Sequence, residues 1–232
     1  MFAASGICYV VSIWQGSREN PQPENTTEYI AAQVKQLTKL KHSISRIIFS
    51  HPGQITNPGY RAFLESIPLQ FDLIEEPTQR RSYGSWINAY KKYRTNYDYY
   101  IFIEDDYVPY IDNFDQILVS HLIEKNAGYL CSWRGPEYHI HAAISNGIAS
   151  SATLEAIHSK NWGFIPYGYP ESYVSNQLGF SEAFTQNGFS IEDYTDCYNS
   201  SFWQSGEKEI KYINTKTSHV LVPVQQMWQN EN

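Results

Sequence analysis

The chain has 232 residues, enough for one large domain with a buried core. Apolar residues make up 42% of it and charged residues 18%, which is typical of a globular protein and excludes a disordered one. The net charge of −7 argues against nucleic acid as a partner, because phosphate contacts require clustered Lys and Arg.

The cysteines and the amino terminus bear on the cellular compartment. Cys8, Cys131 and Cys197 are too few and too scattered for a disulfide framework or a zinc site. The apolar run at 7–14 is far shorter than the roughly 20 residues that cross a bilayer, and no signal-peptide pattern surrounds it. We therefore expect a cytoplasmic protein with no integral membrane segment, unless an anchor lies outside this chain.

The first half of the chain alternates strand-like and helix-like segments. The strands are expected where β-branched and aromatic residues gather, and the helices where apolar residues keep helical spacing. The expected strands are 7–14, 44–50, 71–75 and 99–103, and the expected helices are 26–40, 58–66 and 85–93.

The second half continues in the same way, with a loop rich in aromatic residues at 162–173. The expected helices are 113–125, 151–160 and 175–187, and the expected strands are 128–133, 139–150, 189–193 and 218–222. Strands that alternate with helices predict an α/β fold with a mostly parallel central sheet flanked by helices.

An acidic segment ends the most apolar of these strands. The run from Tyr99 to Ile103 suits a strand buried on both faces of a parallel sheet, and Glu104, Asp105 and Asp106 follow it directly. Ligands of open α/β sheets bind beyond the carboxyl ends of the strands. Adjacent carboxylates repel one another unless a cation neutralises them, and such oxygen clusters suit Mg²⁺ or Mn²⁺. The alternative is an inert, solvated acidic turn.

The segment Ile-Glu-Asp-Asp-Tyr-Val-Pro at 103–109 resembles the DXD region of nucleotide-sugar-dependent glycosyltransferases of the GT-A fold, in its Glu-Asp-Asp form. It is similar to that of the N-acetylglucosaminyltransferase I family, with the close match covering about residues 99–125. The resemblance implies a single Rossmann-like domain over residues 1–232, with a nucleotide-binding half to about residue 110 and an acceptor-binding half after it. It also implies that Asp106 is the metal ligand, that Asp105 contacts the ribose or the metal, and that Glu104 supports the sugar or the metal's waters.

The same resemblance implies contacts to the nucleotide from two loops. Ser12 and Trp14, at the end of the first strand, are candidates for contacts to the base or a phosphate. Arg80 and Arg81, before the helix at 85–93, suit a diphosphate because a guanidinium can donate two parallel hydrogen bonds to phosphate oxygens. An ordinary solvated basic turn is the alternative for the two arginines.

Three further candidates would complete the chemistry. An inverting transferase needs a carboxylate that deprotonates the acceptor hydroxyl, and Glu171 and Glu182 are best placed for this role. Glu171 is favoured because related families carry an acid just ahead of the corresponding helix. The Glu-Asp pair usual there is missing, so surface carboxylates and a retaining mechanism stay open. His219 is the candidate for a second metal ligand, since several GT-A families use a histidine near the carboxyl terminus and imidazole suits Mn²⁺.

The sequence thus predicts a metal-dependent glycosyltransferase that moves a sugar from a nucleotide sugar, UDP-linked by family frequency, to a glycan acceptor. Two other functions remain open. A nucleotidyltransferase would share the sheet and the metal site, but it normally carries a Gly-rich phosphate loop near the amino terminus, and none follows Trp14. A non-catalytic carbohydrate-binding protein would use its aromatic residues for glycan and its acids for structural Ca²⁺.

Overall fold

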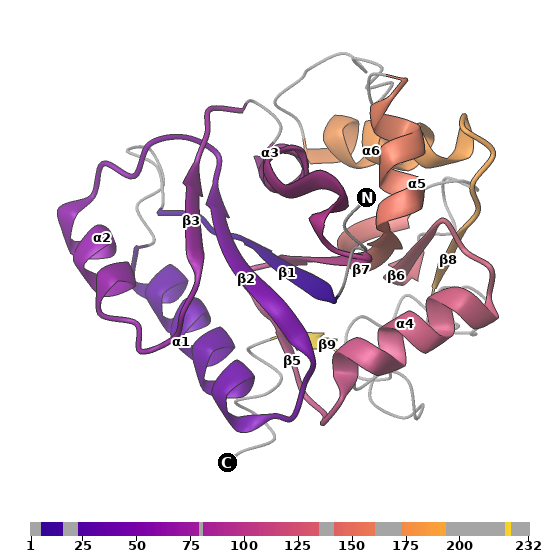
Figure 1. Ribbon diagram of the computed structural model, residues 1–232. Coiled ribbons are helices and arrows are strands. Elements are labelled where there is room, and N and C mark those ends of the chain that lie inside the picture. The colour runs from indigo at the N-terminus through magenta and orange to yellow at the C-terminus, as the bar shows by residue number, and fades with distance from the viewer. Residues whose placement is uncertain are drawn as a thin grey trace, which may run out of the picture.

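The computed structural model describes residues 6–15, 23–78, 81–134, 142–160, 173–193 and 221–223. Its helices and strands alternate along the chain (Figure 1). The first half contains β1 (Ile7–Ser12), α1 (Pro23–Lys39), β2 (Ile44–His51), α2 (Pro58–Glu65), β3 (Asp72–Glu75), α3 (Arg81–Tyr93), a 3-10 turn η1 (Arg94–Asn96) and β4 (Tyr99–Glu104). The second contains β5 (Tyr107–Pro109), α4 (Phe114–Glu124), β6 (Tyr129–Arg134), β7 (Ala142–Ser150), α5 (Ser151–His158), α6 (Tyr173–Thr185), β8 (Ile191–Asp193) and β9 (Leu221–Pro223).

The central sheet has seven strands in the order β3-β2-β1-β4-β7-β6-β8. Its pairs are parallel except those of β7, which runs antiparallel to both β4 and β6. The prediction of a mostly parallel sheet is confirmed. A separate two-stranded antiparallel sheet joins β5 to β9.

Helices cover both faces of the central sheet and bury a hydrophobic core on each (Figure 1). Successive strand residues point to opposite faces, so neighbours in sequence belong to different cores. Val10 and Phe102 pack with α3, α5 and α6. Tyr9 and Ile101 pack with α1, α2 and α4. All six residues of β1 are buried, as expected for a strand covered on both sides.

Helix α3 begins at Arg81, four residues before the expected start at Ser85. Gly84, which precedes the expected helix, lies in the structure in the first turn of α3. A Cβ atom at Gly84 would lie 2.0 Å from the Thr78 hydroxyl oxygen, so the glycine makes room for the Thr78 side chain. The glycine therefore reflects close packing and not a chain reversal.

Candidate active site at the end of β4

Three parallel strands end together at one edge of the sheet, and the candidate site lies there. In the register of the sheet, Ser12 of β1 lies beside Ser50 of β2 on one side and Glu104 of β4 on the other. The Ser12 side chain is buried in this row. The acids predicted to bind a metal thus follow the strand next to β1, where α/β folds of this kind bind ligands.

The three carboxyl groups leave the strand in different directions. The Ser82 hydroxyl, on α3, donates a hydrogen bond to Glu104 Oε1 at 2.7 Å. The backbone N–H of Trp14, after β1, donates to Asp105 Oδ2 at 3.2 Å. Because strand side chains alternate between faces, Glu104 points toward α3 and Asp105 toward the segment after β1. Asp106 follows in the turn between β4 and β5.

Burial makes the charges of these acids unfavourable. Burial, and next the charge on Asp106, raise the pKa of Glu104 to about 8. The same two causes raise the pKa of Asp105 to about 8, although backbone N–H groups oppose them. Burial also raises the pKa of Asp106. The Oδ1 atom of Asp106 is enclosed and has no hydrogen-bond partner.

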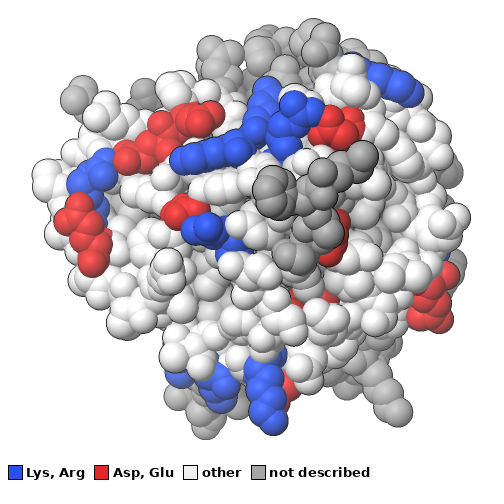
Figure 2. Space-filling view, viewed as in Figure 1, with Lys and Arg blue, Asp and Glu red and all other residues white. Residues whose placement is uncertain are grey.

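No arginine or lysine of the described chain forms an ion pair with these acids. The ion pairs there join Arg46 to Asp72, Arg61 to Glu75, Arg94 to Glu155 and His121 to Glu124. On the face shown in Figure 2, acidic and basic side chains likewise lie next to one another in several places. The acids at the end of β4 therefore lack the compensation that other acids of the molecule have.

Helix α3 is attached to this edge by several hydrogen bonds. The Trp86 indole N–H donates to the backbone oxygen of Ile103 at 3.1 Å, and the Ser50 hydroxyl donates to that of Ser85 at 2.9 Å. The exposed Arg81 begins the helix with φ of 49°, a left-handed conformation that a non-glycine residue seldom adopts. It immediately precedes Ser82, whose hydroxyl bonds Glu104.

An aromatic pair lies where β1 and β2 end. The Trp14 indole, 44% exposed, stacks on the imidazole of His51 with 5.8 Å between ring centroids and 14° between planes. His51 is only 3% exposed. Its Nδ1 lies 2.8 Å from the backbone oxygen of Gly53, and its Nε2 is enclosed without a partner. Sequence analysis missed His51, because a histidine before Pro-Gly signals only the end of a strand.

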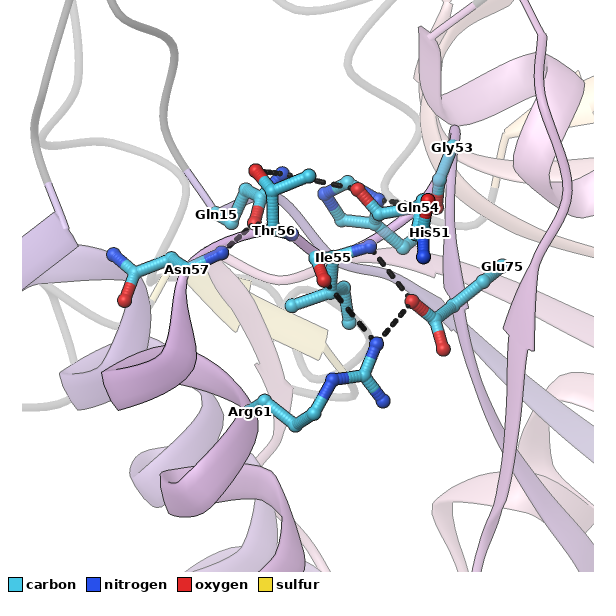
Figure 3. A network of polar contacts seen from close by, with 9 residues as sticks. All are labelled: Gln15, His51, Gly53, Gln54, Ile55, Thr56, Asn57, Arg61 and Glu75. Atoms are coloured by element: carbon cyan, nitrogen blue, oxygen red, sulfur yellow. Dashed lines mark hydrogen bonds and ion pairs between the residues drawn. The ribbon is translucent and has the colours of Figure 1, made fainter.

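The loop that follows β2 is held in place by a polar network (Figure 3). The Gln15 side chain accepts from the backbone N–H groups of Thr56 and Asn57 at 2.9 and 3.1 Å. Glu75 accepts from the backbone N–H of Ile55 at 2.7 Å and from Arg61 at 2.6 Å. The segment after β1 and the loop after β2 are thereby fastened to each other beside the aromatic pair.

The donor atoms fit a divalent cation that takes few protein ligands. Mg²⁺ and Mn²⁺ prefer oxygen donors, and the unpartnered Oδ1 of Asp106 is such a donor. Among the described residues, no group of three His, Cys, Asp or Glu side chains could hold a metal ion. The geometry thus suits an ion that Asp106 binds and that completes its shell with water and ligand oxygens.

The remaining predicted residues are distributed differently. Glu182 lies toward the carboxyl end of α6, where Gln186 Nε2 donates to its Oε2 at 3.2 Å. The end of α6 packs against Tyr129, which begins β6, so the structure does not bring Glu182 together with the acids at the ends of the parallel strands. Arg80, Glu171 and His219 lie outside the described residues, as does most of the aromatic loop at 162–173.

Two supporting residues had no recognisable sequence signal. Asn146, fully buried on β7, accepts a hydrogen bond from the backbone N–H of Glu104 at 3.2 Å. The hydroxyl of Tyr60, on α2, is enclosed without a partner, and burial, followed by the negative charge of Asp105, raises its pKa. Both residues contact the site only because the sheet and its helices fold together.

Comparison with known proteins supports the fold class. No protein-family model matches the sequence, and no curated protein does. A mannosyltransferase from Pyrobaculum calidifontis in complex with GDP-Man and Mn²⁺ has a similar structure, with a TM-score of 0.53 and 11% identity over 81% of this chain and 54% of that one. This chain thus spans about half of the mannosyltransferase. A cytidylyltransferase from Leptospira borgpetersenii gives a TM-score of 0.51 and 12% identity over 82% of this chain and 75% of that one.

A third similar structure is a CMP:2-keto-3-deoxy-manno-octonic acid synthetase complexed with CTP. Its TM-score is 0.52, with 11% identity over 82% of this chain and 89% of that one. The chain therefore shares the fold of these three proteins, and the GT-A-like fold class that the sequence predicted is confirmed. No helix of the described segments combines the length and apolar character needed to cross a membrane.

Proposed function

We propose that the protein is a metal-dependent glycosyltransferase that transfers a sugar from a nucleotide sugar, UDP-linked, to a glycan or glycoconjugate acceptor. The observation that carries this proposal is the uncompensated acidic turn at the end of β4. Three carboxyl groups lie there with raised pKa values, and one enclosed oxygen of Asp106 has no partner. A buried acid without a partner is costly, so its retention favours a role in ligand binding.

The described residues then take distinct roles in the proposed reaction. Asp106 binds Mn²⁺ or Mg²⁺, and a bound ion would neutralise the charge that develops on the departing diphosphate. Arg81 contacts the diphosphate from the beginning of α3, with Arg80 beside it in sequence. Ser12 and Trp14 contact the nucleoside where β1 ends. Asp105, held by the Trp14 N–H, lies on the nucleoside side of the turn. Glu104, held by Ser82, faces α3 and the sugar.

Two predicted residues complete the reaction from outside the described segments. Glu171 deprotonates the acceptor hydroxyl in an inverting transfer, in preference to Glu182, which lies in α6. His219 is proposed as a second metal ligand. The β9 strand, which begins two residues later, pairs with β5 directly after the acidic turn.

Calorimetric titration with UDP tests the proposal. The chain should bind UDP with an affinity that rises at least tenfold when Mn²⁺ is present, and Asp106→Ala should lose the metal-dependent part while keeping its circular dichroism spectrum. Glu155→Gln, which alters an acid paired with Arg94, is the matched control and should bind as the parent does. UDP binding that is equal in parent and Asp106→Ala would contradict the metal assignment.

Nucleotidyl transfer is the second candidate, because two of the similar structures described above are a cytidylyltransferase and a CMP-sugar synthetase. It predicts release of pyrophosphate from CTP or UTP when a sugar phosphate or sugar acid is supplied. Glycosyl transfer instead predicts release of UDP from a UDP-sugar. Measuring both products over the same substrate panel separates the two functions.

A further inference from the structure

The aromatic pair formed by Trp14 and His51 has a feature that the proposed function does not use. The Gly53 backbone oxygen can only accept a hydrogen bond, so Nδ1 of His51, 2.8 Å away, carries the proton. Burial lowers the pKa of His51, which keeps the ring neutral near pH 7. Nε2 is consequently a bare acceptor, and it has no partner although the residue is almost fully buried.

An enclosed acceptor without a donor is unusual, because buried polar groups nearly always have hydrogen-bond partners. Others of the enclosed, unpartnered atoms come from segments around this edge, namely Tyr60, Ser85 and Asp106. Glu75, whose charge acts on His51, instead has its oxygen occupied by Ile55 and Arg61 (Figure 3). Nε2 of His51 therefore belongs to a group of unpartnered atoms around this edge, whereas the acid that fixes the neighbouring loop is satisfied.

The relative orientation of the two rings defines the shape of a partner. A flat ligand that donates to Nε2 in the plane of the imidazole lies parallel to the Trp14 indole, because the two rings are within 14° of parallel. The indole is the exposed member of the pair, while the buried His51 ring is held by its contact to Gly53. One ring then supplies a stacking face and the other supplies a single acceptor.

We infer that His51 selects the nucleobase: its Nε2 accepts a hydrogen bond from a ring N–H, while Trp14 stacks on the base. This inference rests on the proposed function and names the group that would read the base of its donor. Uracil and guanine both present a ring N–H, at N3 and N1. Cytosine has a lone pair at N3, which would face the lone pair of Nε2. The pair thus favours uridine or guanosine donors and disfavours cytidine, the nucleoside of the CTP-bound synthetase that shares the fold.

The hydrogen bonds of Gln15 hold Trp14 and His51 in position next to each other. Gln15 follows Trp14 directly, and its side chain is tied to the loop that carries Gly53 and Thr56 (Figure 3). Asp105 holds the backbone N–H of Trp14 from the other side. The base-reading pair is therefore linked to the acidic turn through one residue, so base and diphosphate would be positioned together.

Calorimetric titration with UDP, GDP, CDP and N3-methyl-UDP in the presence of Mn²⁺ tests the inference. In the parent we expect UDP or GDP to bind at least tenfold more tightly than CDP, and N3-methyl-UDP to bind as weakly as CDP. The relative affinities for UDP and GDP identify which of the two bases the protein binds. His51→Phe keeps a flat ring without the acceptor, and it should bring UDP, CDP and N3-methyl-UDP within about twofold of one another.

Two controls keep the result interpretable. Trp14→Phe retains a stacking face and should keep the preference for UDP over CDP, with weaker binding throughout. His51→Gln is the second variant and replaces His51→Phe if that protein does not fold. The glutamine side chain offers an acceptor oxygen and also a donor N–H group. We therefore expect this variant to bind CDP as well as UDP. Preference unchanged in both His51 variants overturns the inference alone. Absence of binding of every nucleotide to the parent overturns the proposed function as well.

Discussion

Two glutamates end two strands at the same edge of the sheet, and their surroundings differ. Glu75 ends β3, where burial acts to raise its pKa but the Ile55 N–H and the Arg61 guanidinium outweigh it and lower the pKa. Glu104 ends β4, where burial and the charge on Asp106 raise the pKa to about 8 against a single bond from the Ser82 hydroxyl.

The comparison separates an acid that supports the structure from an acid that we propose binds a ligand. Glu75 has its cation on the neighbouring helix α2, and together they fix the loop after β2. Glu104 and its two neighbours have no such cation among the residues that the structure describes. We propose that a bound metal ion and substrate supply the charge that balances them.

Removing the charge of Glu104 should have the largest effect, and it should appear in activity. We expect Glu104→Gln to lower kcat/KM of sugar transfer about 100-fold, equivalent to about 2.7 kcal/mol, because the carboxylate faces the proposed sugar position. The midpoint of urea unfolding should stay the same or rise, since the free-energy cost of burying an ionisable carboxyl group is removed. A marked loss of stability would show that Glu104 is structural, like Glu75.

Glu75→Ala should give the opposite pattern. Its loss leaves the Ile55 N–H and Arg61 without their acceptor, so we expect the free energy of unfolding to fall by about 1–3 kcal/mol in urea titrations. Nucleotide affinity measured below the unfolding transition should change by less than about threefold. An affinity loss as large as that of Asp106→Ala would mean that the two glutamates share one function.

The raised pKa values predict how the metal-free protein responds to pH. An unfolded glutamate or aspartate titrates near 4, whereas Glu104 and Asp105 titrate at about 8 in the folded state. Between these values the folded state binds more protons than the unfolded state, so the contribution of these two acids to stability is lost as pH rises from about 4 to 8. In EDTA, the melting temperature should therefore fall over this range more steeply for the parent than for a Glu104→Gln, Asp105→Asn double variant. Parallel profiles for the two proteins would contradict the prediction.

Ser82→Ala should have the smallest effect of the set. It removes the single side-chain bond that orients Glu104, so we expect kcat to fall about three- to tenfold with little change in KM for the donor. Ser120→Ala, at an exposed serine that bonds only its own helix, is the matched control. Threonine at position 82 keeps the hydroxyl and should recover most of the loss.

Most of the fold could be predicted from the sequence because the periodic segments are long and apolar. The buried runs of β1 and β4 and the apolar positions of α1 and α4 predicted their elements to within a few residues. The pairing of β5 with β9 was missed, because each has three residues and the partners are far apart in the chain. The 3-10 turn at Arg94–Asn96 gave no pattern either.

The candidate site could be predicted from the sequence only in part. Three consecutive acids after a buried strand indicated where a cation would bind, but the sequence could not show that Glu104 and Asp105 face different sides of the sheet with different partners. His51 and Asn146 gain their roles from strands that pair across the sheet, and no local pattern records such pairing. Glu75 and Glu104 look alike in sequence, since each ends an apolar strand, and only the position of Arg61 distinguishes them.

The small β5–β9 sheet has a consequence for the order of folding. Its two strands lie half the chain length apart, whereas β1, β2 and β3 are near neighbours in sequence. Contacts between distant residues form late because closing a long loop costs more entropy. The acidic turn joins the end of β4 to β5, so β1 to β4 can pair during synthesis, whereas β5 gains its β9 partner only after Leu221–Pro223 has been made. The segment after the acidic turn would then reach its final pairing later than the parallel strands before it.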